Sequence, residues 1–454
     1  MPGRIAFALI AGLALHAQAA SAADQSSLPM LLNQGEQLLV FDWPAIRIGT
    51  GEYPDGPTGV TVFHFPERAF GTVDVRGGGP GTVNTDYLRQ GWGNRELDAV
   101  VLSGGSWYGL ESTTAVATAL KDDGVRDGLW DNLSLSVGAI IYDFGDRRLN
   151  EIYPDKRLAQ AAYRAARPGV FPLGAQGAGR NARSGGLFGC NAYSGQGAAF
   201  RQVGELKIAA FVVVNAVGVI THRDGRVAAC YRDAGWPEEL RPADLFANYP
   251  ASRKGGWNPH ATDQAATRNT TIGLVVTNQK LDRAQLDRLA AQVSASMSRA
   301  LQPYATEFDG DVLYAVSTAE LERNVDQSET PNFDLDVLAG EVMWDAILSS
   351  VPRQPEIAKP TGIAADARAY ASYAGEYVFS PAVRVRVMAE GGRLYAQASG
   401  QRKAYAIPLE DRIELLPVTA TRFTVPGRYP LLLDFSERAA LVVNPGHWQQ
   451  VGRR

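Results

Sequence analysis

The chain has 454 residues, of which 45% are hydrophobic and 20% charged, and its formal net charge at pH 7 is −4. This is an ordinary globular composition, and the length exceeds that of a typical single domain, so we expect two or more domains. The slightly acidic balance and the lack of a basic block give no reason to expect nucleic acid as a partner.

The first residues are typical of an export signal. Met1–Arg4 supply a charged start, Ile5–Leu15 form a short apolar run, and small residues continue to Ala23. The run is too short to span a bilayer, and no later run approaches that length. We therefore expect cleavage after Ala22 or Ala23 and a periplasmic or secreted protein without a membrane span.

Strands and helices alternate in the main body, which we place at residues 24–350. β-Branched and apolar runs predict strands at 60–65, 99–102 and 207–214. A helix is predicted at 111–121, and apolar residues at helical spacing predict another at 281–301. Glycine-dense loops at 77–81, 104–105, 174–197 and 255–256 allow tight turns or a close approach of the backbone to a ligand.

A proline-rich linker at 351–369 leads to a separate module at 370–454. Clean alternation in Val383–Val387 is typical of an antiparallel sheet. The motifs Tyr373–Tyr377, Gly391–Leu394 and Gln397–Gln401 resemble the lipocalin-like module of some exported penicillin-binding-protein-like hydrolases. The expectation is a small β-barrel-like unit that packs on the main body or covers its substrate opening, a plain structural role being the alternative.

Asn269 and Thr270 mark a place in mid-chain that reads like the beginning of a protein. A polar run from Asn258 ends at Asn269, and a β-branched strand starts at Thr270. A threonine with a free α-amine can act as a nucleophile, because the amine serves as base for the hydroxyl beside it. Cleavage between these two residues would create that amine. The alternative is an ordinary strand start.

The motifs around this place resemble a known family from about Ile46 to Val316. The similar segments are Thr58–Val62, Gly71–Thr82, Leu102–Gly109, Val137–Asp143, Gly177–Gly179, Val213–Gly218 and Phe308–Asp311. They are similar to the self-processing aminopeptidases and amidases that include the L-aminopeptidase D-Ala-esterase/amidases, β-aminopeptidases and nylon-oligomer endohydrolases. The resemblance implies an α/β fold, a four-layer αββα sandwich of the N-terminal-nucleophile-like type, cut into 24–269 and 270–454.

Asp309 and Asp311 are the predicted partners of Thr270. They stand two residues apart, so in an extended segment both carboxylates point to one side. The nylon-type members have a threonine with two such aspartates, which implies that the pair orients the α-amine and activates the hydroxyl. An Asp-Gly turn without a catalytic role is the alternative.

Asn215 and Tyr142 complete the predicted site. Asn215 interrupts an apolar strand, and a buried amide needs hydrogen-bond partners. The resemblance implies that Asn215 donates to the oxyanion of the tetrahedral intermediate and that Tyr142 helps to hold that oxyanion or the substrate. A structural asparagine that bridges two strands and a core tyrosine are the alternatives.

The glycine-rich stretch Gly179–Gly189 departs from the family pattern. Nylon-type members have a lysine there, whereas this chain has Arg180 and Arg183, and arginine does not give up its proton. Processing or substrate choice is therefore expected to differ. Earlier in the chain, Ser106 is not in a nucleophile elbow, because the required glycine spacing fails. It is predicted to line the pocket, and Trp107 and Tyr108 to shape the substrate cleft or to form a core pair.

Cysteine and histidine give little sign of a metal. Cys190 and Cys230 are the two cysteines, and pairing or two buried thiols are both open. Five scattered histidines form no metal-binding motif, so we expect neither metal nor cofactor.

The sequence thus predicts an exported, self-cleaving hydrolase with a threonine nucleophile. Its substrate would be a short peptide, a β- or D-amino-acid amide or a nylon-type amide, and the resemblance implies a homo-oligomer, a tetramer or larger. Two alternatives stay open: an acyl transferase similar to ornithine acetyltransferase, and a periplasmic binding protein built on an inactive hydrolase.

Overall fold

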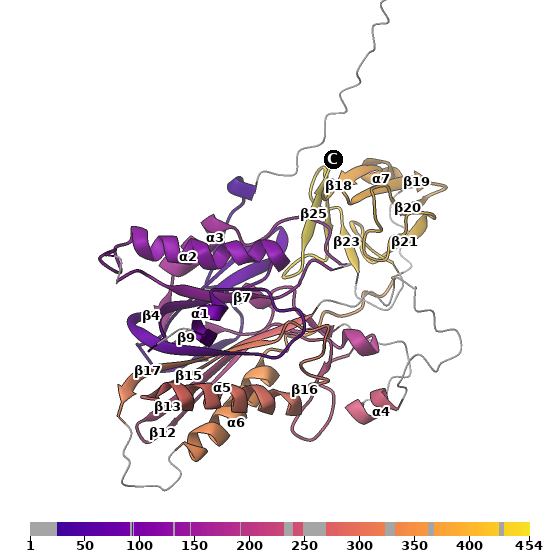
Figure 1. The fold of residues 1–454 in the computed structure, drawn as a ribbon. Coiled ribbons are helices and arrows are strands. Elements are labelled where there is room, and N and C mark those ends of the chain that lie inside the picture. Colours follow the sequence, from indigo (N-terminus) through magenta and orange to yellow (C-terminus); the bar gives the residue numbers. More distant parts are fainter. Residues whose placement is uncertain are drawn as a thin grey trace, which may run out of the picture.

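The computed structural model describes residues 25–90, 93, 95–129, 132–145, 147–190, 192–230, 239–247, 269–322, 332–361, 367–425 and 431–454. The predicted signal peptide and residues 258–268 of the polar run lie outside them. The described chain forms a layered α/β body up to the end of α6 (Phe333–Ser349) and a barrel from β18 (Gly375–Val378) onward (Figure 1). None of the described helices is both long enough and apolar enough to cross a membrane.

One long strand, β4 (Gly56–Val75), belongs to both halves of the main sheet. Its first part pairs with β3 (Arg47–Tyr53), and its last part pairs with β17 (Val312–Leu321). The sheet continues through β6 and β7 on one side and through β15, β13 and β12 on the other. These five strands span Glu96–Ser103, Ser136–Ile140, Thr270–Gln279, Leu206–Asn215 and Gln196–Val203, respectively.

The strands of the main sheet bury both of their faces. In β13, Phe211 and Val213 belong to the core between the two halves of the sheet, together with Phe63 of β4. Ala210 and Val212 point the other way, into a second core under the helices. Because side chains alternate along a strand, a run that is apolar at every position can fill two cores at once.

Helices cover the two outer faces of the sheet halves. α2 (Glu111–Asp122) and α3 (Lys156–Arg164) pack on the β3–β4–β6 side, where Val101 and Leu158 share a core. α5 (Arg283–Ser296) and α6 pack on the β13–β15–β17 side. Figure 1 shows the two helical layers on opposite sides of the sheets. The predicted αββα layering is confirmed.

The helix predicted at 281–301 is shorter in the structure. It begins after Asp282, whose side chain accepts a hydrogen bond from the backbone N–H of Gln285 at 2.9 Å, a normal N-terminal cap. α5 ends at Ser296, and a single 3₁₀ turn follows. Leu301 is therefore wrong as a helical residue: it starts the short strand β16 (Leu301–Gln302) and still reaches the core beneath α5.

Shorter elements complete the body. The short strands are β1 (Leu31–Leu32), β2 (Leu38–Val40), β5 (Thr82–Val83), β8 (Arg167–Pro168), β9 (Val170–Pro172), β10 (Arg183–Ser184), β11 (Ala192–Tyr193) and β14 (Val219–Ile220). The short helices are α1 (Thr85–Gln90) and α4 (Pro242–Phe246).

The C-terminal module is a closed antiparallel barrel preceded by α7 (Ala367–Tyr373). Val385 and Val387 point into its core, and Arg386 between them is exposed, as the alternation in the sequence predicts. The expected barrel-like module is thus confirmed. After β18 its strands are β19 (Arg384–Glu390), β20 (Arg393–Ala398), β21 (Ile413–Pro417), β22 (Arg422–Thr424), β23 (Leu432–Asp434), β24 (Ala440–Val443) and β25 (Gln450–Arg453).

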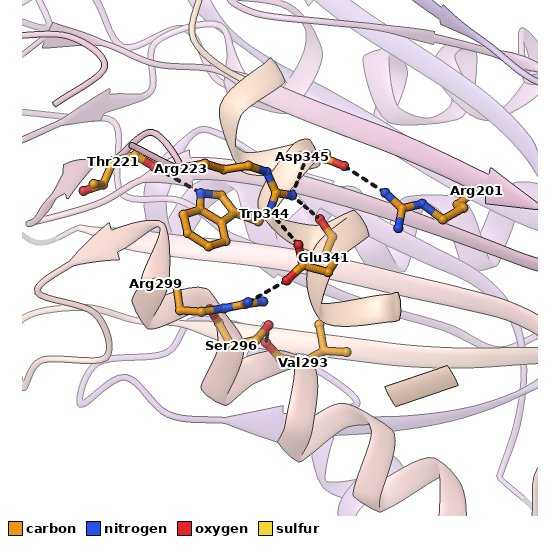
Figure 2. A network of polar contacts seen from close by, with 9 residues as sticks. All are labelled: Arg201, Thr221, Arg223, Val293, Ser296, Arg299, Glu341, Trp344 and Asp345. Atoms are coloured by element: carbon orange, nitrogen blue, oxygen red, sulfur yellow. Dashed lines mark hydrogen bonds and ion pairs between the residues drawn. The ribbon is translucent and has the colours of Figure 1, made fainter. Parts of the chain in front are cut away.

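A polar network fixes the outer face of α6 (Figure 2). The Trp344 ring lies between the guanidinium groups of Arg223 and Arg299, 4.7 and 4.9 Å from its centroid. Its indole N–H donates to the carbonyl of Thr221 at 3.1 Å. Both arginines also donate to Glu341, one turn earlier in the helix. The network connects α6 to the segment after β14 and to the end of α5.

Cys190 and Cys230 form a disulfide, with an S–S distance of 2.12 Å. The bond joins the segment after the glycine-rich stretch to the segment after β14, next to the buried side chains of Val219, Leu240 and Leu245. The sequence left open whether the two cysteines are paired or are free thiols, and in the structure they are paired.

Candidate active site

Thr270 is the first residue of β15, in the middle of the sheet. It is 3% exposed. Asn269 extends the parallel pairing of β15 with β17 by one bridge, to Asp309. The Thr270 hydroxyl donates to the carbonyl oxygen of Asn269 at 2.5 Å, and the backbone N–H of Gly310 donates to the same oxygen at 2.8 Å. Two donors therefore point at the carbonyl of the peptide bond predicted to be cut.

The two predicted aspartates lie directly beside this peptide bond, and both are 1% exposed. Asp311 accepts from the backbone N–H groups of Thr271 at 2.5 Å and Ala305 at 2.9 Å. Asp309 accepts from the Thr306 hydroxyl at 2.7 Å and from the N–H of Val217 at 3.2 Å. The N–H of Thr306 also donates to Asp309 at 3.2 Å, so each carboxylate accepts from two backbone N–H groups.

Burial controls the protonation of the pair. Burial, reinforced by the neighbouring carboxylate of Asp309, raises the pKa of Asp311 to about 8. Burial also raises the pKa of Asp309. Because burial and the repulsion between the two carboxylates both disfavour the doubly charged state, the pair keeps a proton near neutral pH. Such a pair can accept or release a proton without a metal.

Gly310, between the two aspartates, was not among the predicted site residues. A Cβ atom at this position would lie 2.8 Å from the Thr270 hydroxyl oxygen and 2.7 Å from the carbonyl oxygen of Gly79. Only glycine lets the backbone come this close to the hydroxyl. The Asp-Gly-Asp motif is the signal in the sequence that could have identified Gly310. The motif suggested a role for its two carboxylates, and its backbone N–H was not considered as a donor.

The glycine-dense loop at 77–81 supports the same segment. Gly77 and Gly79 donate their N–H groups to the carbonyls of Asp311 and Asp309, at 3.2 and 2.9 Å. A Cβ atom at Gly77 would lie 2.2 Å from the backbone nitrogen of Asp311. The sequence predicted tight turns or a close approach to a ligand; in the structure the loop instead lies close to the backbone of the aspartate segment.

Asn215 lies directly opposite Thr270 in the antiparallel pairing of β13 and β15. Its side-chain oxygen accepts from the N–H of Arg183 at 3.0 Å, and its side-chain nitrogen donates to the carbonyl of Tyr142 at 3.0 Å. The amide therefore bridges two backbone segments next to the nucleophile. This is the arrangement of the structural alternative, and its role as an oxyanion donor stays a prediction. Tyr142 meets Asn215 through its backbone, and its half-buried side chain stays a predicted oxyanion or substrate contact.

Ser106 is buried and occupies a turn with φ 53°, where its hydroxyl accepts from the N–H groups of Asp143 and Phe144 at 3.1 and 3.0 Å. Trp107 is 52% exposed and lies against Gly81 in the glycine loop. Tyr108 lies against the rings of Phe144 and Tyr153. Trp107 is therefore the one of these three residues that lies beside the loop supporting Asp309.

Arg180 does not stand in for the missing lysine. It is buried, ion-paired with Glu52, and its Nε donates to the carbonyl of His447 in the barrel at 2.8 Å. Arg183 contributes its backbone N–H to Asn215. Among the described residues there is no group of three or more His, Cys, Asp or Glu side chains that could hold a metal ion.

Comparisons with known proteins show the family of the chain. Residues 39–362 match the model of peptidase family S58. The chain belongs to this family, and it is a hydrolase of peptide or amide bonds. The match ends before the barrel, which begins at Gly375.

Two curated relatives are similar to most of the body. The 6-aminohexanoate-oligomer endohydrolase of Paenarthrobacter ureafaciens is 38% identical over 338 residues, which are 72% of this chain and 90% of that protein. The enzyme of the same name from Agromyces sp. (strain KY5R) is 37% identical over 338 residues, with the same coverage of 72% and 90%. A solved structure, the β-aminopeptidase of Burkholderia sp., is 18% identical with a TM-score of 0.49, over 72% of this chain and 90% of that one.

Proposed function

We propose that this protein is an exported amide hydrolase that activates itself by cleaving the bond between Asn269 and Thr270. The observation that carries the proposal is the meeting of two donors, the Thr270 hydroxyl and the Gly310 N–H, at the carbonyl of Asn269. A nucleophile beside a carbonyl that already accepts a backbone hydrogen bond is the arrangement needed for acyl transfer.

The processing step moves the acyl group from nitrogen to oxygen. The Thr270 oxygen bonds to the carbonyl carbon of Asn269, and the negative charge on the carbonyl oxygen is stabilised by the Gly310 N–H. The hydroxyl proton leaves for the carboxylate pair of Asp309 and Asp311, which returns a proton to the Thr270 nitrogen as the C–N bond breaks. Water then hydrolyses the ester and leaves an Asn269 carboxylate and a free Thr270 amine.

The same hydroxyl then serves substrate hydrolysis. It attacks the substrate amide carbon, and the new α-amine of Thr270 takes the hydroxyl proton and gives it to the leaving amine. Water then hydrolyses the acyl ester on Thr270, which releases the acid product and restores the hydroxyl. Asp311, already bonded to the N–H of Thr271, orients the new terminus. Asn215 and Tyr142 are proposed to contact the oxyanion or the substrate once the segment before Thr270 has been released.

The family and the curated relatives support the choice of substrates. The two curated relatives named above are described as endohydrolases of 6-aminohexanoate oligomers. We infer that linear amides with unbranched amino-acid units, and short peptides or β-peptides with a free N-terminus, are the first compounds to test. The exposed ring of Trp107, beside the glycine loop, provides an apolar wall for such a chain.

Intact mass and N-terminal sequencing of the purified protein test the proposal. Wild type is expected to give two fragments, the second starting at Thr270, and to hydrolyse a 6-aminohexanoate oligomer. Thr270→Ser keeps the hydroxyl and is expected to cut. Thr270→Val keeps the shape of the side chain without the hydroxyl and is expected to remain one chain.

The outcomes separate the alternatives. A wild-type chain that stays uncut on long incubation overturns the self-processing mechanism and favours the binding-protein alternative. Cleavage in Thr270→Val would show that another group is the nucleophile. Gel filtration of the cut protein tests the homo-oligomer that the resemblance implies.

A further inference from the structure

The C-terminal barrel docks on two segments of the body, and the first is the loop after Tyr142. Leu149 of this loop is 1% exposed and belongs to the core of the barrel itself. Gln450, the first residue of β25, accepts from the N–H of Leu149 at 2.6 Å and donates to the carbonyl of Arg147 at 2.8 Å. Gln450 is 2% exposed, so both atoms of its amide are committed to the body's backbone in a dry contact.

The second segment is the glycine-rich stretch that contains Arg180 and Arg183, with the strand β11 that pairs with it. Tyr193 of β11 stacks on Trp448 of the barrel with ring centroids 4.0 Å apart, and its hydroxyl lies 3.0 Å from that of Tyr405. Arg180 donates to the carbonyl of His447 beside Trp448. The linker also contacts this segment. The Gln354 side-chain amide accepts from the N–H of Tyr193 and donates to the carbonyl of Tyr193.

These two segments carry the backbone groups that hold Asn215. The carbonyl of Tyr142 begins the first segment, and the N–H of Arg183 lies on the second, in register with Tyr193 in the β10–β11 pair. Asn215 in turn faces Thr270. Contacts therefore run from the barrel through the second segment to the residue opposite the nucleophile, and the first segment reaches that residue along the chain that leads back to Tyr142.

We propose that the barrel is a positioning module for the active site: it clamps the two segments that hold the Asn215 amide, and so sets the geometry at Thr270. This inference rests on the proposed function. The physical reason is that acyl transfer demands a close fit between nucleophile and carbonyl, and a displacement of a fraction of an ångström at a distant support slows it. Gln450, Trp448 and Tyr405 are positioning residues in this scheme.

Self-cleavage of the full chain tests the inference without a substrate. Gln450→Ala removes both hydrogen bonds of its amide to the first segment, and the rate of cleavage at Thr270 is expected to fall about 10-fold. The matched control is Gln397→Ala, also in the barrel, whose amide donates to the barrel's own carbonyl of Leu409 at 2.8 Å. It is expected to cut at the wild-type rate. Thermal unfolding of both variants shows whether their folding is equally affected.

A second measurement reports the clamp itself. Hydrogen exchange of the peptide containing the Arg183 amide is expected to be faster in Gln450→Ala and in Trp448→Leu than in wild type and Gln397→Ala. Trp448→Leu loosens the second segment directly, and Gln450→Ala loosens the Tyr142 segment, which holds the Asn215 amide that accepts from Arg183. Should Gln450→Ala misfold, Trp448→Leu provides the same two readouts. The inference is overturned if both variants fold and show faster exchange at Arg183, and yet cleave themselves at the wild-type rate. Unchanged exchange at Arg183 overturns it as well. An uncut wild type would instead overturn the proposed function.

Discussion

Gly77 and Gly79 stand two residues apart in one loop, yet they face different surroundings. A Cβ atom at Gly77 would lie 2.2 and 2.4 Å from backbone atoms of Asp311 and Asp309, whereas at Gly79 the nearest atom is 3.9 Å away. Backbone atoms cannot move aside as a flexible side chain can. The close approach at Gly77 therefore fixes the position of both carboxylates.

Alanine substitutions in this loop are expected to differ sharply. Gly77→Ala would push the aspartate segment away from Thr270 and slow self-cleavage by about 100-fold, since small misplacements at a reacting group have effects of that order. Gly79→Ala is expected to cut within about twofold of wild type, because it has room and keeps its N–H. The check is the rate of fragment formation by mass spectrometry. Equal rates in the two variants would contradict this account.

The carboxylate pair predicts how stability depends on pH. The pKa of Asp311 is raised from an ordinary 3.8 to about 8 in the folded protein. The unfolded chain therefore releases a proton that the folded chain keeps, and stability falls as the pH rises from about 4 to about 8. Asp309→Asn removes the neighbouring negative charge, which lowers the pKa of Asp311 and so reduces this loss.

The measurement is the free energy of unfolding at pH 5 and pH 8, in the uncut Thr270→Val background. The double variant Thr270→Val/Asp309→Asn is expected to lose less stability between these pH values than Thr270→Val alone. The two variants differ in titrating groups only at Asp309, so the difference between the two slopes reports the raised pKa of Asp309 together with its effect on Asp311. Parallel slopes would mean that Asp309 neither has a raised pKa nor raises that of Asp311.

At the scale of the element, α6 depends on Trp344. Its ring is held between Arg223 and Arg299, and its N–H is bonded to the carbonyl of Thr221 (Figure 2). Trp344→Ala removes the ring and leaves that carbonyl without the indole donor. We expect a loss of about 2 kcal/mol, less than the full cost of a buried tryptophan because the ring is only half-buried.

Val337 gives the matched comparison on the same helix, because it is 45% exposed. Val337→Ala is expected to change the free energy of unfolding by about 0.5 kcal/mol or less. Trp344→Phe, which keeps a ring but not the N–H, is expected to fall between the two. Urea unfolding monitored by circular dichroism gives all three values, and a Trp344→Ala variant as stable as Val337→Ala would contradict this assignment of the network.

At the scale of the whole molecule, the Cys190–Cys230 disulfide closes a loop across 40 residues. A cross-link of this span restricts the unfolded chain, and its loss is expected to cost about 2–4 kcal/mol. The Cys190→Ser/Cys230→Ser variant is therefore expected to unfold at a lower temperature. Dithiothreitol should lower the unfolding temperature of wild type and leave that of the variant unchanged; no effect on wild type would mean that the disulfide is absent or unimportant.

Local patterns were enough to predict single strands and the antiparallel character of the module, whereas the layers and the barrel were implied by the resemblances. The alternation in Val383–Val387 and the unbroken apolar run of β13 follow from the two-residue period of a strand, which any single segment displays. Thr270 and the two aspartates were singled out through the resemblance; the structure brings them together, and their catalytic roles stay predictions. Leu301 was misassigned because its apolar character fits a helix stripe and a short buried strand equally well.

Contacts between distant segments could not be predicted, because they depend on how the strands pair and the modules dock. The donation of Gly310 to the Asn269 carbonyl needs β15 beside β17, and the bridge made by Asn215 needs two loops from other parts of the chain. The sequence indicated that Arg180 would not replace a basic lysine, but only the structure shows its partners, Glu52 and a carbonyl of the barrel. The sequence by itself determined which groups this protein has for its chemistry, and the tertiary structure decided which of them meet.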